Sequence, residues 1–142
     1  MKKVLAGGRF NIIHAGHIYF LKKAKSLGDF LVVVIANDRT VKNQGKKIFY
    51  QERIRKSVVE SIKFVDRAVI GYPIKGQDGY IKIVKDERPN VIALGYDQKI
   101  NIPFLKQRLR KIGIKCKIKR ISQLKGFETN KILKLKNKQV QK

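Results

Sequence analysis

The sequence predicts an α/β domain with a parallel five-stranded sheet and helices on both faces. Strand-like and helix-like segments alternate along the chain, with short connections between them. Parallel strands joined in this way need crossover connections, which are almost always right-handed. The segment at 30–36, FLVVVIA, is nearly all apolar and β-branched, as is typical of a central strand covered on both faces. A length of 142 residues suits one core, so we predict a single Rossmann-like domain.

The first elements are predicted from one apolar run and one periodic run. Residues 4–8, VLAGG, are expected to form a buried strand that stops at a tight turn. From 17 to 27, apolar residues recur at the spacing of one helix face, and Gly28 is a natural C-terminal stop. The strand at 30–36 follows, and we predict that the polar segment after it, at 37–47, is a loop.

The middle of the chain repeats this alternation. Residues 51–63 are predicted to form a helix with Ile54, Val58 and Ile62 on one face. A third strand, a third helix and a fourth strand are expected at 67–71, 80–85 and 90–95.

The last third holds one further strand between two helices. A helix is predicted at 103–112, before Gly113. In 114–120 apolar residues alternate with lysines, which indicates an edge strand with one wet face. A final helix is expected to begin near Glu128. We therefore assign residues 1–136 to the domain and 137–142 to a basic tail.

The charge is strongly positive, with 34 Lys and Arg against 10 Asp and Glu and a net charge of +24. Such a field attracts nucleotide phosphates, nucleic acid or a membrane surface without selecting among them. No apolar run approaches the ~20 residues of a membrane span, and no signal peptide is apparent. The single cysteine, Cys116, excludes an internal disulfide. We therefore expect a cytoplasmic protein without membrane attachment.

The only two histidines lie in GGRFNIIHAGH, residues 7–17, directly after the first strand. Ligands of parallel α/β sheets bind beyond the C-terminal ends of the strands, so this segment is the main candidate site. It is neither a Walker loop nor G-x-G-x-x-G. Two histidines are too few for zinc, which takes three or four protein ligands, and Cys116 is expected on the far edge strand. Two interpretations remain: histidines that satisfy local hydrogen bonds, or histidines that donate to phosphate oxygens at a helix N-terminus.

This motif resembles the G-x-F-D-x-x-H-x-G-H signature of the cytidylyltransferase-like nucleotidyltransferases. GFETNKI, residues 126–132, resembles the second element of that family, a serine/threonine-rich helix start. ANDRTV at 36–41, the Glu52–Arg53 pair and LGYDQ at 94–98 most resemble the archaeal FAD synthases. That branch transfers AMP from ATP to FMN and releases pyrophosphate. The alternative is a cytidylyl- or adenylyltransferase, using CTP or ATP, that acts on glycerol 3-phosphate or a sugar phosphate.

The resemblance implies direct in-line transfer, without a covalent enzyme intermediate. It assigns catalysis to His14, His17 and Lys46. The nucleotide-binding residues that it implies are Gly8, Arg9, Phe10, Asn11, His14, His17, Gly95, Tyr96, Asp97, Gln98, Arg120, Thr129 and Asn130. The acceptor-binding residues are Asn11, Asp38, Lys46 and Lys47. Mg²⁺ or another divalent cation is expected to arrive with ATP rather than in a metal site built by the protein.

Two residues depart from the signature. Arg9 stands where the family usually has a small polar residue, and it adds a cation beside the phosphates. Asn11 replaces the usual aspartate and removes a negative charge. The sequence therefore leaves the exact acceptor open.

The rival class is a nucleic-acid-binding protein. Residues 103–142 are rich in Lys and Arg and hold one acidic residue, Glu128. The aromatic side chains there, which base stacking would need, are Phe104 and Phe127. We therefore expect weak, salt-sensitive nucleic-acid binding only as a side property. A homodimer is a further expectation.

Overall fold

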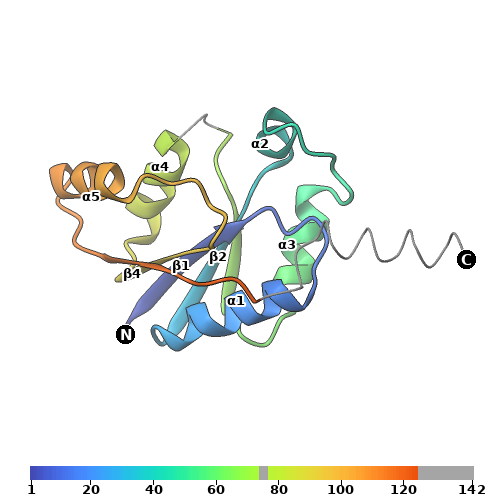
Figure 1. Cartoon of the computed structure of the whole chain (residues 1–142), viewed down its shortest axis with the longest axis horizontal. Coiled ribbons are helices and arrows are strands. Elements are labelled where there is room, and N and C mark those ends of the chain that lie inside the picture. Colours follow the sequence, from blue (N-terminus) through green and yellow to red (C-terminus); the bar gives the residue numbers. More distant parts are fainter. Residues whose placement is uncertain (74–76, 125–142) are drawn as a thin grey trace, which may run out of the picture.

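The computed structural model describes residues 1–73 and 77–124, and it confirms the predicted α/β fold (Figure 1). The strands are β1 (Lys3–Gly8), β2 (Phe30–Ile35), β3 (Arg67–Ile70), β4 (Val91–Leu94) and β5 (Lys117–Arg120). The helices are α1 (Ala15–Ser26), α2 (Asp38–Asn43), α3 (Glu52–Glu60), α4 (Gln77–Glu87) and α5 (Ile102–Lys111). All strand pairs are parallel, in the order β3-β2-β1-β4-β5. The chain builds outward from β1 to β3 and then crosses to β4, so the strand order switches between β1 and β4. Ligands of open α/β sheets bind at such a point.

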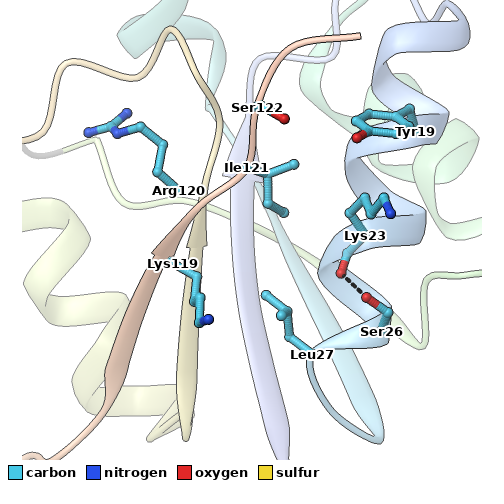
Figure 2. Close-up of a pocket in the computed structure, with 8 residues that line it drawn as sticks. All are labelled: Tyr19, Lys23, Ser26, Leu27, Lys119, Arg120, Ile121 and Ser122. Carbon is cyan, nitrogen blue, oxygen red and sulfur yellow. Dashed lines mark hydrogen bonds between the residues drawn. The ribbon is translucent and has the colours of Figure 1, made fainter.

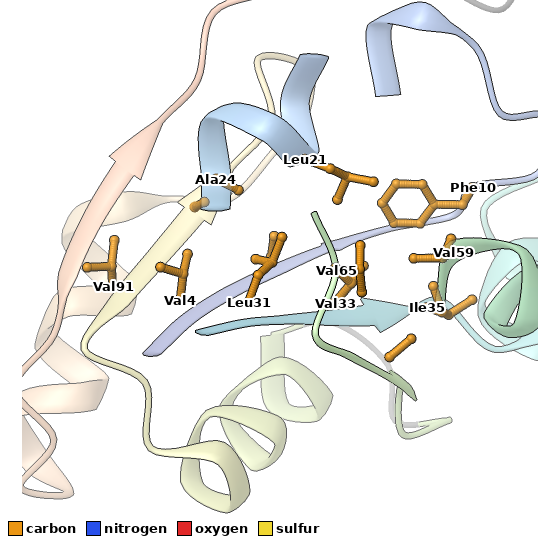
Figure 3. Packing of buried hydrophobic residues seen from close by; sticks show 13 residues of the cluster. Val4, Phe10, Leu21, Ala24, Leu31, Val33, Ile35, Val59, Val65 and Val91 are labelled. Carbon is orange, nitrogen blue, oxygen red and sulfur yellow. The ribbon is translucent and has the colours of Figure 1, made fainter. Parts of the chain in front are cut away.

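The sheet separates two hydrophobic cores, because successive residues of a strand point to opposite faces. One core lies under α1 and α3, and Figure 3 shows its packing. Its main members are Val4, Ala6, Phe10, Leu21, Ala24, Leu31, Val33, Ile35 and Val59. The other core lies under α4 and α5, and its main members are Leu5, Val32, Ile81, Val84, Ile92, Leu94, Leu105 and Leu109. Helices therefore cover both faces, as the sequence predicts.

The prediction of a loop throughout 37–47 is wrong, because this segment contains α2. The Asn37 side chain accepts a hydrogen bond from the Thr40 N–H (2.8 Å) and donates one to the Gly71 carbonyl (3.0 Å). Val41 supplies one buried apolar contact. A capping asparagine and a single buried valine thus hold this short helix, although its composition is polar. The helix ends before Gly45, whose φ of +73° suits glycine.

Helix α3 turns a different face to the core than its apolar pattern indicates. Ile54 and Val58 are exposed, at 49% and 43%, whereas Arg55 and Val59 are buried. The predicted apolar face is therefore wrong for Ile54 and Val58, whereas Ile62, just after the helix, packs against the core. The physical reason is a set of oxygen acceptors that converge on the Arg55 guanidinium, described below.

The remaining boundaries differ from the predictions by a few residues. Helix α1 begins two residues before His17, and α4 is longer than the predicted 80–85. Strand β5 is an edge strand, as predicted, with its lysines exposed and Ile118 packed on the sheet's second core. The helix expected from Glu128 and the tail at 137–142 lie outside the described residues. Within the described residues, no helix has the length and apolar character to cross a bilayer.

Candidate active site

The two histidines form the N-terminal cap of α1. His14 is the N-cap residue, and its Nδ1 accepts a hydrogen bond from the Gly16 N–H at 3.0 Å. In return, Nδ1 of His17 accepts from the His14 N–H at 3.2 Å. This is a capping box, in which two side chains satisfy helix N–H groups reciprocally, built here from histidines. The ring centroids lie 4.0 Å apart, at the end of β1 where the site was predicted.

This cap determines which ring nitrogen carries the proton. Because each Nδ1 accepts a hydrogen bond, a neutral imidazole here bears its proton on Nε2. The pKa of His17 is lowered from 6.5 to about 4, mainly by burial, with the neighbouring His14 and Arg9 acting in the same direction. His17 is therefore neutral at pH 7 and able to donate through Nε2–H. The capping and phosphate-binding interpretations are compatible, because they use different nitrogens.

The buried Phe10 ring packs against His17. Its ring is 4% exposed and its centroid lies 5.4 Å from that of His17. A Cβ on Gly8 would lie 2.9 Å from the Phe10 ring, so a larger residue there would require the ring to shift. Phe10 has a φ of +51°, a left-handed conformation that costs a bulky residue about 1–3 kcal/mol. Phe10 is one of the predicted nucleotide-binding residues. Because its ring is buried, it can face a ligand only with its backbone.

The turn after β4 is joined to the end of β1 by Gln98. Its Oε1 accepts from the Gly95 N–H at 2.7 Å, and its Nε2 donates to the Gly7 carbonyl at 3.1 Å. The Arg120 guanidinium donates to the carbonyls of Gly95 (2.8 Å) and Gln98 (2.9 Å). Gln98 and Arg120 thus hold the turn at 95–98 in place at the switch point of the sheet.

Tyr96 and Asp97 are the exposed side chains of this turn. Tyr96 is 45% exposed. They are therefore the members of the predicted set at 95–98 whose side chains reach the surface. The Arg120 guanidinium, in contrast, is bonded to carbonyls of this turn.

Residues 44–50, which we call the lysine segment, carry the exposed Lys46 and Lys47. Asn11 fastens this segment to the turn between β1 and α1. Its Nδ2 donates to the Lys47 carbonyl at 2.5 Å, and its Oδ1 accepts from the Phe49 N–H at 3.1 Å. An amide can donate and accept in this way, whereas an ionised carboxylate only accepts. This geometry explains why asparagine suits the position where the family usually has aspartate.

Arg9, the other departure, reaches the same segment. Its Nη1 donates to Gln44 Oε1 at 3.2 Å. It also lies close enough to His17 to lower the pKa of that imidazole. Arg9 therefore brings positive charge beside the histidines while contacting the end of α2.

Asp38, predicted to bind the acceptor, forms a salt bridge with Arg55 at 2.7 Å. The sequence analysis missed Arg55, which is 1% exposed. The apolar residues Ile54 and Val58, which are exposed, led to the prediction of a different buried face of α3. The apolar residues Val59 and Ile62, four and seven positions after Arg55, were the signal that could have identified it.

A separate groove of about 280 Å³ lies between α1 and β5. Figure 2 shows Tyr19, Lys23 and Leu27 on one side and Lys119 and Ile121 on the other, with the Arg120 side chain directed away from α1. Neither histidine lines this groove, so we place the candidate chemistry at the strand ends and not here.

Metal ligands are sparse in residues 1–73 and 77–124. No group of three or more His, Cys, Asp or Glu side chains in these residues is arranged to hold a metal ion.

Thr129 and Asn130, predicted to bind the phosphates, lie outside the described residues. The described site therefore consists of the β1–α1 turn, the lysine segment and the turn at 95–98.

Comparisons with known proteins identify the family of this chain. The cytidylyltransferase-like family model matches residues 5–137. The FAD synthase of Aciduliprofundum boonei is 45% identical over 130 residues, which cover 92% of this chain and 85% of that protein. The FAD synthase of Ferroglobus placidus is 46% identical over 121 residues, covering 85% and 76% of the two chains.

A solved structure has the same fold. The crystal structure of the lipopolysaccharide core biosynthesis protein from Thermoplasma volcanium aligns with a TM-score of 0.82 and 43% identity, over 87% of this chain and 98% of that one. A pantoate-beta-alanine ligase from Francisella tularensis, at 19% identity and a TM-score of 0.62, shares the fold alone. Since the family model spans almost the whole sequence and relatives above 40% identity cover most of both chains, this chain belongs to the cytidylyltransferase-like family.

Proposed function

We propose that this chain is an FMN adenylyltransferase, which transfers AMP from ATP to FMN to give FAD and pyrophosphate. The relatives named FAD synthase support the reaction. The observation that carries the proposal is the histidine cap. Its Nδ1 atoms are occupied by backbone N–H groups, so a neutral ring at either position carries its proton on Nε2, at a helix N-terminus that favours anions.

The reaction needs positioning and charge stabilisation rather than a protein nucleophile. A phosphate oxygen of FMN attacks the α-phosphorus of ATP, the new P–O bond forms, and the bond to the β-phosphate oxygen breaks. The electron pair leaves with pyrophosphate. Negative charge spreads over the phosphate oxygens during this step, and fixed N–H donors stabilise it most. His14 and His17 would supply such donors.

The other proposed roles follow the three parts of the site. Tyr96 and Asp97 would contact the nucleobase or ribose, because they are the exposed side chains of the turn after β4. Lys46 and Lys47 would bind the phosphates of the substrates from the lysine segment. Lys46 is the one of the pair that we place in catalysis.

The residues described around the site do not form a cage for a metal ion. Mg²⁺ commonly keeps several waters and binds through substrate phosphates. We propose that it arrives with ATP, and no protein residue is assigned to it.

The reaction is tested by incubating the purified protein with ATP or CTP and with FMN, glycerol 3-phosphate or a sugar phosphate. Pyrophosphate release is measured together with FAD by chromatography. FAD is expected from ATP and FMN. Pyrophosphate from another pair, without FAD, would move the chain to a sister activity of the same family.

The role of the histidines is tested with His17→Ala. Loss of one preorganised donor to a developing oxyanion typically lowers the rate by ~10²–10³. Lys22→Ala is the matched control, since Lys22 is exposed on the same helix. Near wild-type turnover in folded His17→Ala would contradict the role.

Two proposed associations concern the molecular surface. Ile54 and Val58 lie on one exposed face of α3, and such apolar exposure supports a homodimer, which sedimentation would detect. The net charge of +24 supports weak nucleic-acid binding that falls steeply with added salt.

A further inference from the structure

Arg55 is a fully buried cation on α3 that reaches the site without facing solvent. Its guanidinium makes four hydrogen bonds. Nε donates to the Tyr50 carbonyl (2.8 Å), Nη1 to the carbonyls of Arg9 and Ala36 (2.7 Å each), and Nη2 to Asp38 Oδ1 (2.7 Å). Its side chain is 0% exposed.

These four acceptors come from the segments that surround the candidate site. Arg9 lies in the turn between β1 and α1, and Ala36 follows β2. Asp38 is the first residue of α2, and Tyr50 ends the lysine segment. One rigid, planar group thus joins the turn that leads into the histidine cap of α1 to the segment that bears the lysines.

The contact with Arg9 extends to His17. The Arg9 carbonyl belongs to the peptide that precedes Phe10, and Phe10 is the residue with a φ of +51°. Such a conformation persists only where its surroundings hold it. Arg55 holds one side of that peptide, and the buried Phe10 ring then packs against the ring of His17.

A lysine at position 55 could not make the same set of hydrogen bonds. A guanidinium presents five donors in a fixed plane, whereas an ammonium is a compact charge with three donors on a flexible chain. With lysine at position 55, several of the four acceptors would lose their partner, and the peptide of Arg9 would no longer be held.

We propose that Arg55 is a positioning residue for AMP transfer, which fixes the Arg9 peptide and thereby the His17 imidazole, and ties the lysine segment to the same turn. The catalytic part of this inference rests on the proposed function. The positioning of His17 does not, because it can be measured without any substrate.

The experiment compares Arg55→Lys with Val59→Ala. Val59 is buried one turn further along α3 and contacts the core, so its truncation controls for lost stability. Three quantities are measured: kcat and KM for ATP and FMN, the pKa of His17 by imidazole NMR, and the melting temperature.

In Arg55→Lys, kcat should fall about 10²-fold, since a misplacement near 1 Å can cost that much. KM should change far less, and the pKa of His17 should rise from about 4 toward 6.5 as its ring loosens. Val59→Ala should lower only the melting temperature.

If Arg55→Lys fails to fold, Asp38→Asn takes its place. It keeps the shape and an acceptor oxygen but removes the anion that pairs with Nη2, and we expect about a tenfold loss in kcat with the same direction of change at His17. A His17 pKa that stays near 4 in the folded variant overturns the inference, whichever reaction the chain catalyses. So does a kcat loss no greater than that of Val59→Ala. Absence of FAD synthesis by the wild-type protein refutes the proposed function alone, because the His17 titration still decides the role of Arg55.

Discussion

Acidification should destabilise this protein by an amount that can be traced to His17. Its pKa falls from 6.5 in the unfolded chain to about 4 in the folded protein, mainly because the ring is buried. The folded state therefore binds this proton less readily than the unfolded state. The resulting stability is complete above pH 6.5 and is lost as the pH falls toward 4. At 1.36 kcal/mol per pKa unit, the loss is roughly 3 kcal/mol, which is large for a domain of ordinary stability.

His17→Gln isolates this contribution. Glutamine at the third helical position can still accept from the N-cap backbone, as in an ordinary capping box, but it does not titrate. Urea unfolding of both proteins, followed by circular dichroism from pH 4 to pH 8, measures the free energy of unfolding at each pH. We expect the wild-type protein to lose roughly 3 kcal/mol more than His17→Gln between pH 7.5 and pH 4.

The comparison removes the other titrating groups, because both proteins share them. Above pH 7, where His17 is neutral in both the folded and unfolded states, the difference between the two proteins should be flat. Parallel loss of stability in the two proteins across the whole range would refute the reasoning. An NMR titration of His17 with a midpoint near 6.5 would refute it independently, since the ring would then be accessible to solvent.

Two further substitutions test the turn between β1 and α1. Gly8→Ala places a Cβ 2.9 Å from the Phe10 ring, and such overpacking should cost about 1–3 kcal/mol, measured by urea unfolding; unchanged stability would show that the ring moves freely. Asn11→Asp removes the donor to the Lys47 carbonyl and brings two oxygens together. The lost contact should cost about 1–3 kcal/mol and leave the lysine segment less ordered. The KM for FMN should then rise about tenfold, as measured by initial rates. An unchanged KM with a lower Mg²⁺ requirement would instead assign the carboxylate to a metal ion.

Local patterns were sufficient where a segment's neighbours in sequence determine its environment. The apolar run at 30–36 predicted β2, and helical spacing after the glycines predicted α1, because burial on both faces or on one face leaves a distinct periodicity. The signature around His14 and His17 likewise placed the site at the end of β1. The same reasoning failed at 37–47, because one asparagine cap and one buried valine are enough to hold α2.

Long-range hydrogen bonds account for what the patterns missed in the site. Asn11 is explained by backbone groups of Lys47 and Phe49, which lie more than thirty positions away. The family signature could assign Asn11 a place near the substrates, but not this bridging contact. Gln98 is a similar case, since its amide meets the Gly7 carbonyl across the switch point.

The sequence by itself determined the α/β class, the parallel sheet, the position of the histidines and the family, because hydrophobic periodicity and a contiguous motif are written in neighbouring residues. Only the tertiary structure decided that Arg55 is buried, that Ile54 and Val58 are exposed, and that both Nδ1 atoms are engaged. The physical reason is that burial of a charged side chain depends on its hydrogen-bond partners. A charged side chain is buried only where oxygen acceptors from separate segments meet it, and here Arg9 and Arg55 stand 46 positions apart. Folding brings those acceptors together, and the local pattern of Val59 and Ile62 could indicate only which face of α3 is buried.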